Sequence, residues 1–173
     1  MPATWIKIGS VELNASNSNI EFTNIPNTYK DLVLFTNLRT TSATTFGVPK
    51  LRFNGATTDA NMDNRAALSD GLGKSNSVTS AGYAIRRCPG GNVTADYFGT
   101  ATIWFANYAS TTKHKFFTGF AVSPATTGAE SSININGSCW SDTSAISSIK
   151  IIDDNGASFA QYSSAWLYGI GDN

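Results

Sequence analysis

Hydrophobic and polar residues alternate one by one along much of this chain of 173 residues. Phe116, Thr118, Phe120 and Val122, for example, would share one face of an extended segment. Because successive side chains of a β-strand point to opposite faces, a period of two indicates strands that are buried on one side. The pattern predicts ten strands, at residues 4–13, 18–25, 31–39, 48–54, 81–87, 97–108, 114–123, 131–140, 146–152 and 158–170.

Asn-Gly pairs lie beside three of these alternating segments. They are Asn54-Gly55, Asn136-Gly137 and Asn155-Gly156. Asn and Gly tolerate the positive φ angles that two-residue hairpin turns require. We therefore expect hairpin turns at all three pairs.

The predicted elements indicate an all-β fold. No long window shows the period of 3.6 that an amphipathic helix requires, and the only short helical candidate is Asn64 to Leu68. Many short strands without helices between them favour two packed antiparallel sheets. We predict a jelly-roll-like β-sandwich that forms a single domain over residues 1–173.

Two segments carry apolar residues beyond the ordinary alternation. Leu32 to Phe35 is apolar on both faces, as expected for a strand covered on each side by the same chain or by a neighbouring subunit. The final run, Phe159 to Ile170, places four large side chains on one face, namely Tyr162, Trp166, Tyr168 and Ile170. In a monomer these side chains would belong to the core.

The other tryptophans, Trp5, Trp104 and Trp140, also lie in predicted strands, so the core is the default position for each. An aromatic ring that remained exposed beside Asn, Asp or Arg would instead suit a sugar, because the ring contacts the apolar face and the polar groups meet the hydroxyls.

The longest segment without strand character runs from Ala56 to Ser80. A loop of this length in a compact domain is often functional, although an ordered surface excursion is the alternative. It is the best candidate for contact with a partner or receptor. The residues chosen there are Asp59, Asn61, Asp63, Asn64 and Arg65.

The charge balance disfavours nucleic acid as a partner, because 12 Lys and Arg residues are matched by 12 Asp and Glu residues. No apolar stretch is long enough for a membrane span, and the N-terminal residues do not resemble a signal peptide. Cys88 and Cys139 permit one disulfide at most, and free thiols are the preferred interpretation.

The sequence offers no recognisable catalytic apparatus, so we predict a protein that is not an enzyme. Its only histidine, His114, lies between two lysines and reads as a solvated turn residue rather than a general base. Glycoside cleavage needs two suitably spaced carboxylates, and no such pair is recognisable. Asp153-Asp154-Asn155-Gly156 lacks the spacing of a calcium loop. We therefore assign no catalytic, cofactor or metal residue.

Several stretches, in this order, resemble short virion structural proteins of tailed bacteriophages, often described as tail-fibre proteins. The first runs from Ile20 through Ile25-Pro26-Asn27-Thr28-Tyr29 to Leu34, and the last is Ala165-Trp166-Leu167-Tyr168-Gly169-Ile170. Two others lie between them, at residues 51–55 and 137–149. Together they span most of the chain, and residues 56–92 depart most from the pattern.

The resemblance implies a place in the virion after assembly in the host cytoplasm, with other virion proteins as partners. It also implies a homo-oligomer, with a trimer favoured. The leading expectation is a tail-fibre or adhesin subunit that contacts a receptor or polysaccharide on the host surface. A capsid decoration protein that stabilises the phage head is the alternative, and a carbohydrate-active enzyme or lectin is the third interpretation.

Overall fold

The computed structural model describes residues 4–69, 85–124 and 131–171, and within them the chain is built from strands without a helix. The strands are β1 (Thr4–Glu12), β2 (Asn19–Phe22), β3 (Asp31–Leu38), β4 (Phe46–Gly47), β5 (Pro49–Phe53), β6 (Met62–Ser69), β7 (Cys88–Pro89), β8 (Gly99–Phe105), β9 (Lys115–Ser123), β10 (Ser132–Trp140), β11 (Ile149–Asp153) and β12 (Ser164–Gly171). The expected all-β class is confirmed.

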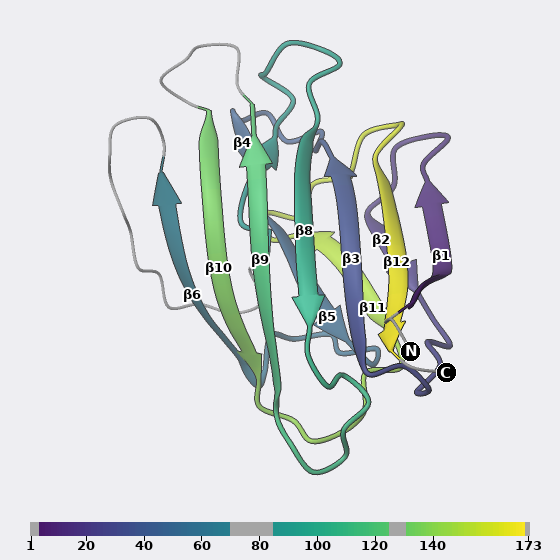
Figure 1. Ribbon diagram of the computed structural model, residues 1–173. Helices are drawn as coiled ribbons and strands as arrows, with labels where there is room; N and C mark the ends of the chain where they lie inside the picture. Colours follow the sequence, from purple (N-terminus) through teal and green to yellow (C-terminus); the bar gives the residue numbers. More distant parts are fainter. Residues whose placement is uncertain (1–3, 70–84, 125–130, 172–173) are drawn as a thin grey trace.

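These strands form a large sheet and a smaller sheet packed behind it (Figure 1). The large sheet has seven strands in the order β1-β12-β3-β8-β9-β10-β6, and the smaller one has the order β2-β11-β5. A short ladder pairs β4 with β7. All of these pairs are antiparallel, so the expected two-sheet antiparallel sandwich is confirmed.

The path of the chain through the two sheets is that of a jelly roll. The first and last strands, β1 and β12, pair in the large sheet, whereas β2 and β11 pair in the small one. The chain then alternates between sheets, with β3 in the large sheet and β5 in the small one. Strands β9, β10 and β6 extend the large sheet beyond this arrangement, so that it is much wider than its partner.

The hydrophobic core fills the space between the sheets. Leu32 and Leu34 on β3 are fully buried in it. Phe53 on the small sheet has its ring centroid 5.9 Å from that of Phe105 and 5.6 Å from that of Phe117, both on the large sheet. Such edge-to-face contacts join the two layers.

Ion pairs and hydrogen bonds of buried charged side chains stabilise the connections around the small sheet. The Nζ atom of Lys50, which is 5% exposed, lies 2.5 Å from carboxylate oxygens of both Asp59 and Asp154. The buried Asp153 carboxylate accepts hydrogen bonds from the backbone N–H groups of Val48 and Asn155, at 2.6 and 3.1 Å. The Asp153-Asp154 pair therefore anchors a turn.

Several sequence predictions differ from the structure. Met62–Ser69, within the predicted loop and across the helical candidate Asn64 to Leu68, is strand β6, because its backbone pairs with β10. The part of that predicted loop from residue 70 to 80 lies outside the described residues. Of the strand predicted at 81–87, only 85–87 are described, and they form no strand; pairing begins at Cys88.

The three Asn-Gly pairs have different outcomes. Asn54 and Gly55 have φ angles of 53° and 73° and form a turn, but β5 pairs with β11, so the turn closes no hairpin. Gly156 likewise has a φ of 76° in a turn that leads from one sheet to the other. Asn136-Gly137 lies in the middle of β10, where pairing on both sides outweighs the local turn preference.

Both cysteines are free thiols, as the sequence predicted. Cys88 is buried and Cys139 is half-buried. Burial raises the pKa of each thiol, and the nearby Asp153 and Asp63 carboxylates add to the effect at Cys88 and Cys139 respectively. Neither thiol is therefore activated as a nucleophile.

Candidate functional site

The most distinctive surface is the face of the large sheet turned away from the small sheet, which we call the outer face. The strand register places three rows of residues side by side across β12, β3, β8, β9 and β10. The rows are Tyr168, Val33, Trp104, Thr118 and Gly137; Trp166, Phe35, Thr102, Phe120 and Ile135; and Ser164, Asn37, Thr100, Val122 and Ile133. None of these residues carries a charge.

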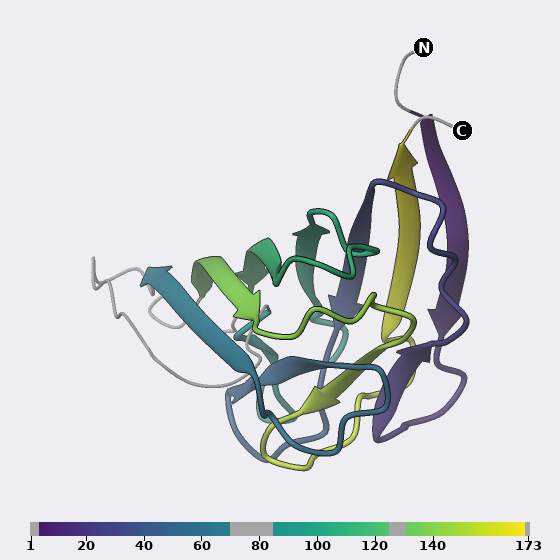
Figure 2. The same cartoon turned by 90° about the horizontal axis from the view of Figure 1, so that it is seen from below.

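Aromatic side chains gather on one half of the outer face. The ring centroid of Trp5 lies 5.9 Å from that of Phe35, 6.1 Å from that of Tyr168 and 6.4 Å from that of Trp104. Trp5 belongs to β1 and Trp104 to β8, and two strands separate them, a backbone distance of roughly 14 Å. Figure 2 shows that the large sheet curves, so that β1 and β12 lean away from the small sheet and toward the outer face. This curvature brings the rings together.

The aromatic rings enclose a hollow and cover an apolar residue beneath them. Trp5, Phe35, Trp166 and Tyr168 line a depression of about 390 Å³, which we call the aromatic hollow. Val33 lies between Tyr168 and Trp104 in its row and is completely buried, although it does not belong to the core between the sheets. The strand that is apolar on both faces is thus covered on each side by its own chain.

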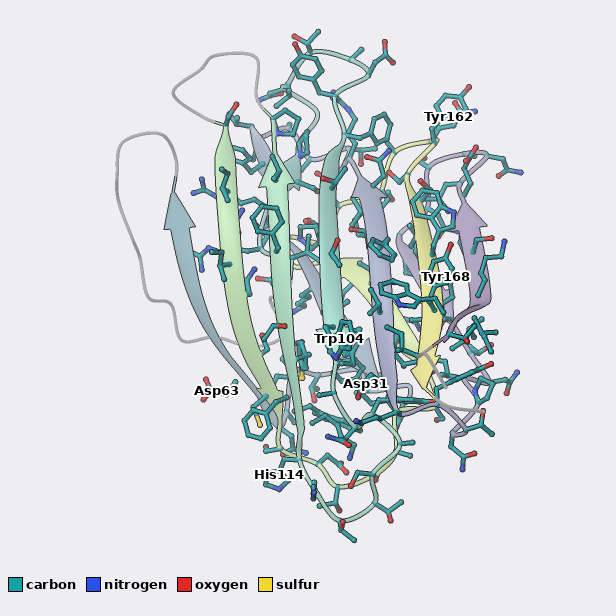
Figure 3. The ribbon with its side chains drawn as sticks, in the orientation of Figure 1. Asp31, Asp63, Trp104, His114, Tyr162 and Tyr168 are labelled. Carbon is teal, nitrogen blue, oxygen red and sulfur yellow. The ribbon has the colours of Figure 1, made fainter. Side chains whose placement is uncertain are left out.

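The default assignment of the tryptophans to the core is wrong for three of the four. Trp5 is 49% exposed and Trp104 is 38% exposed, while Trp166 is half-buried beside Tyr168. Trp140 alone is a core residue. On β12 the core is filled by Ala165 and Leu167 instead, and Trp166 and Tyr168 alternate with them on the opposite face. Figure 3 shows Tyr168 on the outer face.

A second apolar area lies on the other half of the outer face. Phe120 is directly opposite Ile135 on the neighbouring strand, and Val122 is directly opposite Ile133. We call these four residues the β9–β10 patch. Phe120, Ile133 and Ile135 are 48%, 50% and 61% exposed.

Strand β10 is inverted relative to an ordinary half-buried strand. Its isoleucines point outward, whereas Ser132, Asn134, Asn136 and Ser138 on the opposite face are buried. Each apolar side chain left in water forgoes roughly 1 to 3 kcal/mol of burial energy, and each buried amide must be compensated by hydrogen bonds. A strand with this arrangement is best explained if a further surface covers its apolar side.

The residues chosen from the sequence do not form one loop site. Asp59 is an ion-pair partner of Lys50 and of Arg52, whose Nε lies 3.3 Å from an Asp59 oxygen. Asn61 is exposed, and its carbonyl accepts hydrogen bonds from the N–H and the hydroxyl of Ser141 at 2.7 and 3.1 Å. Asp63 is exposed on the edge strand β6, opposite Cys139 (Figure 3).

Asn64 and Arg65 also lie in strand β6 rather than in a loop, and their side chains are outside what the structure describes. The outer face was not among the candidate sites predicted from the sequence. A signal was present, because Ile133 and Ile135 alternate with Asn134 and Asn136, but alternation does not show which set faces the core.

Two buried lysines of the described region, Lys50 and Lys115, make structural contacts. Burial lowers the pKa of Lys50, but its hydrogen bonds and ion pairs with Asp154 and Asp59 outweigh this, so the pKa is raised overall. Burial lowers the pKa of Lys115, whose Nζ donates to the carbonyl oxygens of Lys113 and Asp142 at 2.9 and 3.3 Å. His114 is exposed in the connection before β9, as predicted.

Neither metal ligands nor a membrane helix can be identified within the described ranges. Over residues 4–69, 85–124 and 131–171, no three His, Cys, Asp or Glu side chains are grouped as metal ligands would be. The same part of the chain contains no helix with the length and hydropathy needed to cross a bilayer.

Comparison with known proteins identifies no family. No protein-family model matches the chain, and no curated protein matches its sequence. An aerolysin-like protein from Bombina maxima aligns with 80% of this chain and 83% of its own, at 9% sequence identity and a TM-score of 0.12. A likeness this weak carries no argument about fold or function.

Proposed function

We propose that this chain is a non-enzymatic structural subunit of a tailed bacteriophage particle, and that it serves there as a tail-fibre or adhesin subunit that contacts the host surface. The observation that carries the proposal is the centre of the outer face, where exposed apolar side chains lie in rows that contain no charged residue. A subunit of a larger assembly buries such a face against its neighbours, whereas a monomer gains nothing from exposing it.

The sequence stretches that resemble virion proteins support the same proposal. Leu32, Leu34 and Leu167, which belong to them, are core residues of the jelly roll. Trp166 and Tyr168, in the last stretch, line the aromatic hollow. The resembling segments therefore include both residues that build the fold and residues of the candidate assembly surface.

The surroundings of the carboxylates favour a structural role over catalysis. Asp59 and Asp154 neutralise Lys50, and Asp153 accepts backbone hydrogen bonds. The Oε2 atom of Glu21 lies 3.1 Å from the Nζ atom of Lys150. Exposed residues at the rim of the sandwich would make the contact with the host surface. Asn61 and Asp63, both exposed, are the candidates there.

The location of the chain in purified particles tests the proposal. Antibody labelling in electron microscopy, combined with quantitative mass spectrometry, should find the chain on the tail in roughly a few dozen copies or fewer. A position on the head with copies on the order of hundreds would identify the decoration role instead. Absence from the particle would contradict both.

A further inference from the structure

We infer that the outer face is the surface through which copies of this chain associate, with the β9–β10 patch of one copy packed against the aromatic hollow of another. This inference rests on the proposed role as a structural subunit and names the occupant of its apolar face. Three properties of the face support a second copy as the partner: its area, the lack of charge in its central rows and the arrangement of its apolar side chains on the two halves.

The exposed apolar area matches what a stable association between two copies requires. Six large side chains of the outer face are between 38% and 64% exposed: Trp5, Trp104, Phe116, Phe120, Ile133 and Ile135. At about 200 Å² for each side chain, they leave roughly 600 Å² of apolar surface in water. With the half-buried rings of the hollow added, the face approaches the roughly 800 Å² that each partner buries in a typical specific interface.

The absence of charge favours a second copy over a partner with a charged surface. In a twofold contact, residue i of one copy meets residue j of the other and j meets i, so two uncharged areas can pair without leaving a charge buried and unpaired. The three central rows of the outer face contain no charged residue. The charged side chains Lys7 and Glu12 lie at the edge strand β1, in the position of an interface rim.

The two halves of the face present different apolar side chains, aromatic rings on one half and Phe120, Val122, Ile133 and Ile135 on the other. The aromatic hollow is a depression of about 390 Å³, and Phe120 and Ile135, which are 48% and 61% exposed, lie on the other half. Thr102 lies between Phe35 and Phe120 in the second row, near the middle of the face. A twofold axis passing close to Thr102 would place the β9–β10 patch of each copy over the hollow of the other, which gives a dimer instead of the trimer that the sequence resemblance implies.

Sedimentation velocity of the full chain tests the inference. Between about 1 and 100 µM we expect a dimer of about 37 kDa, twice the 18.4 kDa of the monomer, whereas a trimer would contradict the twofold contact. The double variant Phe120→Thr, Ile135→Thr keeps residues with high strand preference at exposed positions, so it should fold but associate at least about tenfold more weakly. Circular dichroism verifies that its fold is retained.

A matched control separates loss of this surface from general loss of hydrophobicity. Tyr162 is 61% exposed, as Ile135 is, but lies in the connection before β12, away from the patch (Figure 3). Its φ of 69° suits asparagine, so Tyr162→Asn should fold and associate like the wild-type protein. The fluorescence of Trp5 and Trp104 should shift to shorter wavelength as the wild-type concentration rises, and should stay constant in the double variant.

A wild-type chain that remains monomeric at about 100 µM would overturn the inference, as would a double variant that associates as strongly as Tyr162→Asn. A monomeric chain that is nevertheless found on the tail would leave the proposed function standing and remove only the second copy as partner. If the chain forms the dimer but is absent from the particle, the inference about the second copy stands and the proposed function is contradicted.

Discussion

The aromatic ring of Tyr29 occupies the space that a Cβ atom on Gly169 would need. Gly169 is buried on β12, opposite Leu32 of β3, and the ring packs directly against its backbone. A side chain at this position would push the ring away from the sheet. The glycine is therefore required by close approach rather than by an unusual backbone conformation.

Gly169→Ala should destabilise the protein by about 2 kcal/mol or more, because the added methyl group overpacks the contact with Tyr29. Gly137→Ala is the matched control, since it is also a mid-strand glycine but a Cβ there would meet nothing within 4 Å. We expect the control to be neutral or to stabilise by about 0.5 kcal/mol. Urea unfolding of both variants at one protein concentration measures the difference.

Lys50→Met should lower the free energy of unfolding by about 1 to 3 kcal/mol, because the Asp59 and Asp154 carboxylates lose their shared cation in a partly buried site. Lys150→Met removes the more exposed pair with Glu21, in which both side chains are about one-third exposed. That loss should cost less than about 1 kcal/mol. Equal losses in the two variants would show that the buried ion pairs add nothing beyond a surface pair.

The raised pKa of Lys50 predicts that its contribution to the free energy of unfolding depends on pH in the alkaline range. The pKa of Lys50 is raised in the folded protein, so its contribution is complete below its ordinary pKa of 10.5 and is lost as the pH rises through the higher folded value. The difference in unfolding free energy between wild type and Lys50→Met should therefore be constant up to about pH 10 and shrink above it. A difference that grows above that pH would contradict the assignment.

Asp153→Ala should cost about 2 to 4 kcal/mol, because the carboxylate accepts backbone hydrogen bonds from Val48, Asn155 and Ala157, at 2.6, 3.1 and 3.3 Å. Asp153→Asn keeps one acceptor oxygen and should lose about half as much. Thermal unfolding of the two variants gives the comparison. If both substitutions were harmless, the turn after β11 would not depend on this carboxylate.

The sequence predicted most strands because their alternation is local. Ile149 and Ile151 flank Lys150 and lie in strand β11, and Phe53 and Leu51 flank Arg52 in β5. Strand β6 was missed for the opposite reason. Its alanines, asparagine and aspartate have weak strand preference, and only the backbone of β10, far away in sequence, makes the segment a strand.

The outer face could not be predicted as a candidate site from the sequence, for a related reason. The pattern correctly grouped Phe116, Thr118, Phe120 and Val122 on one face of β9, with Phe117 and Ala121 on the other. Both faces contain apolar residues, so alternation alone could not say which of them packs in the core. Asp59 was predicted to contact a partner or receptor, whereas Lys50 and Arg52 pair with its carboxylate in the folded chain.

The sequence by itself determined the all-β class, the antiparallel sandwich and the position of most strands, because these follow from side chains within a few residues of one another. Only the tertiary structure decided that the tryptophan-bearing side of the large sheet faces outward. Three strands of the small sheet can cover only part of one side of a seven-stranded sheet, and which side they cover depends on how distant segments pair.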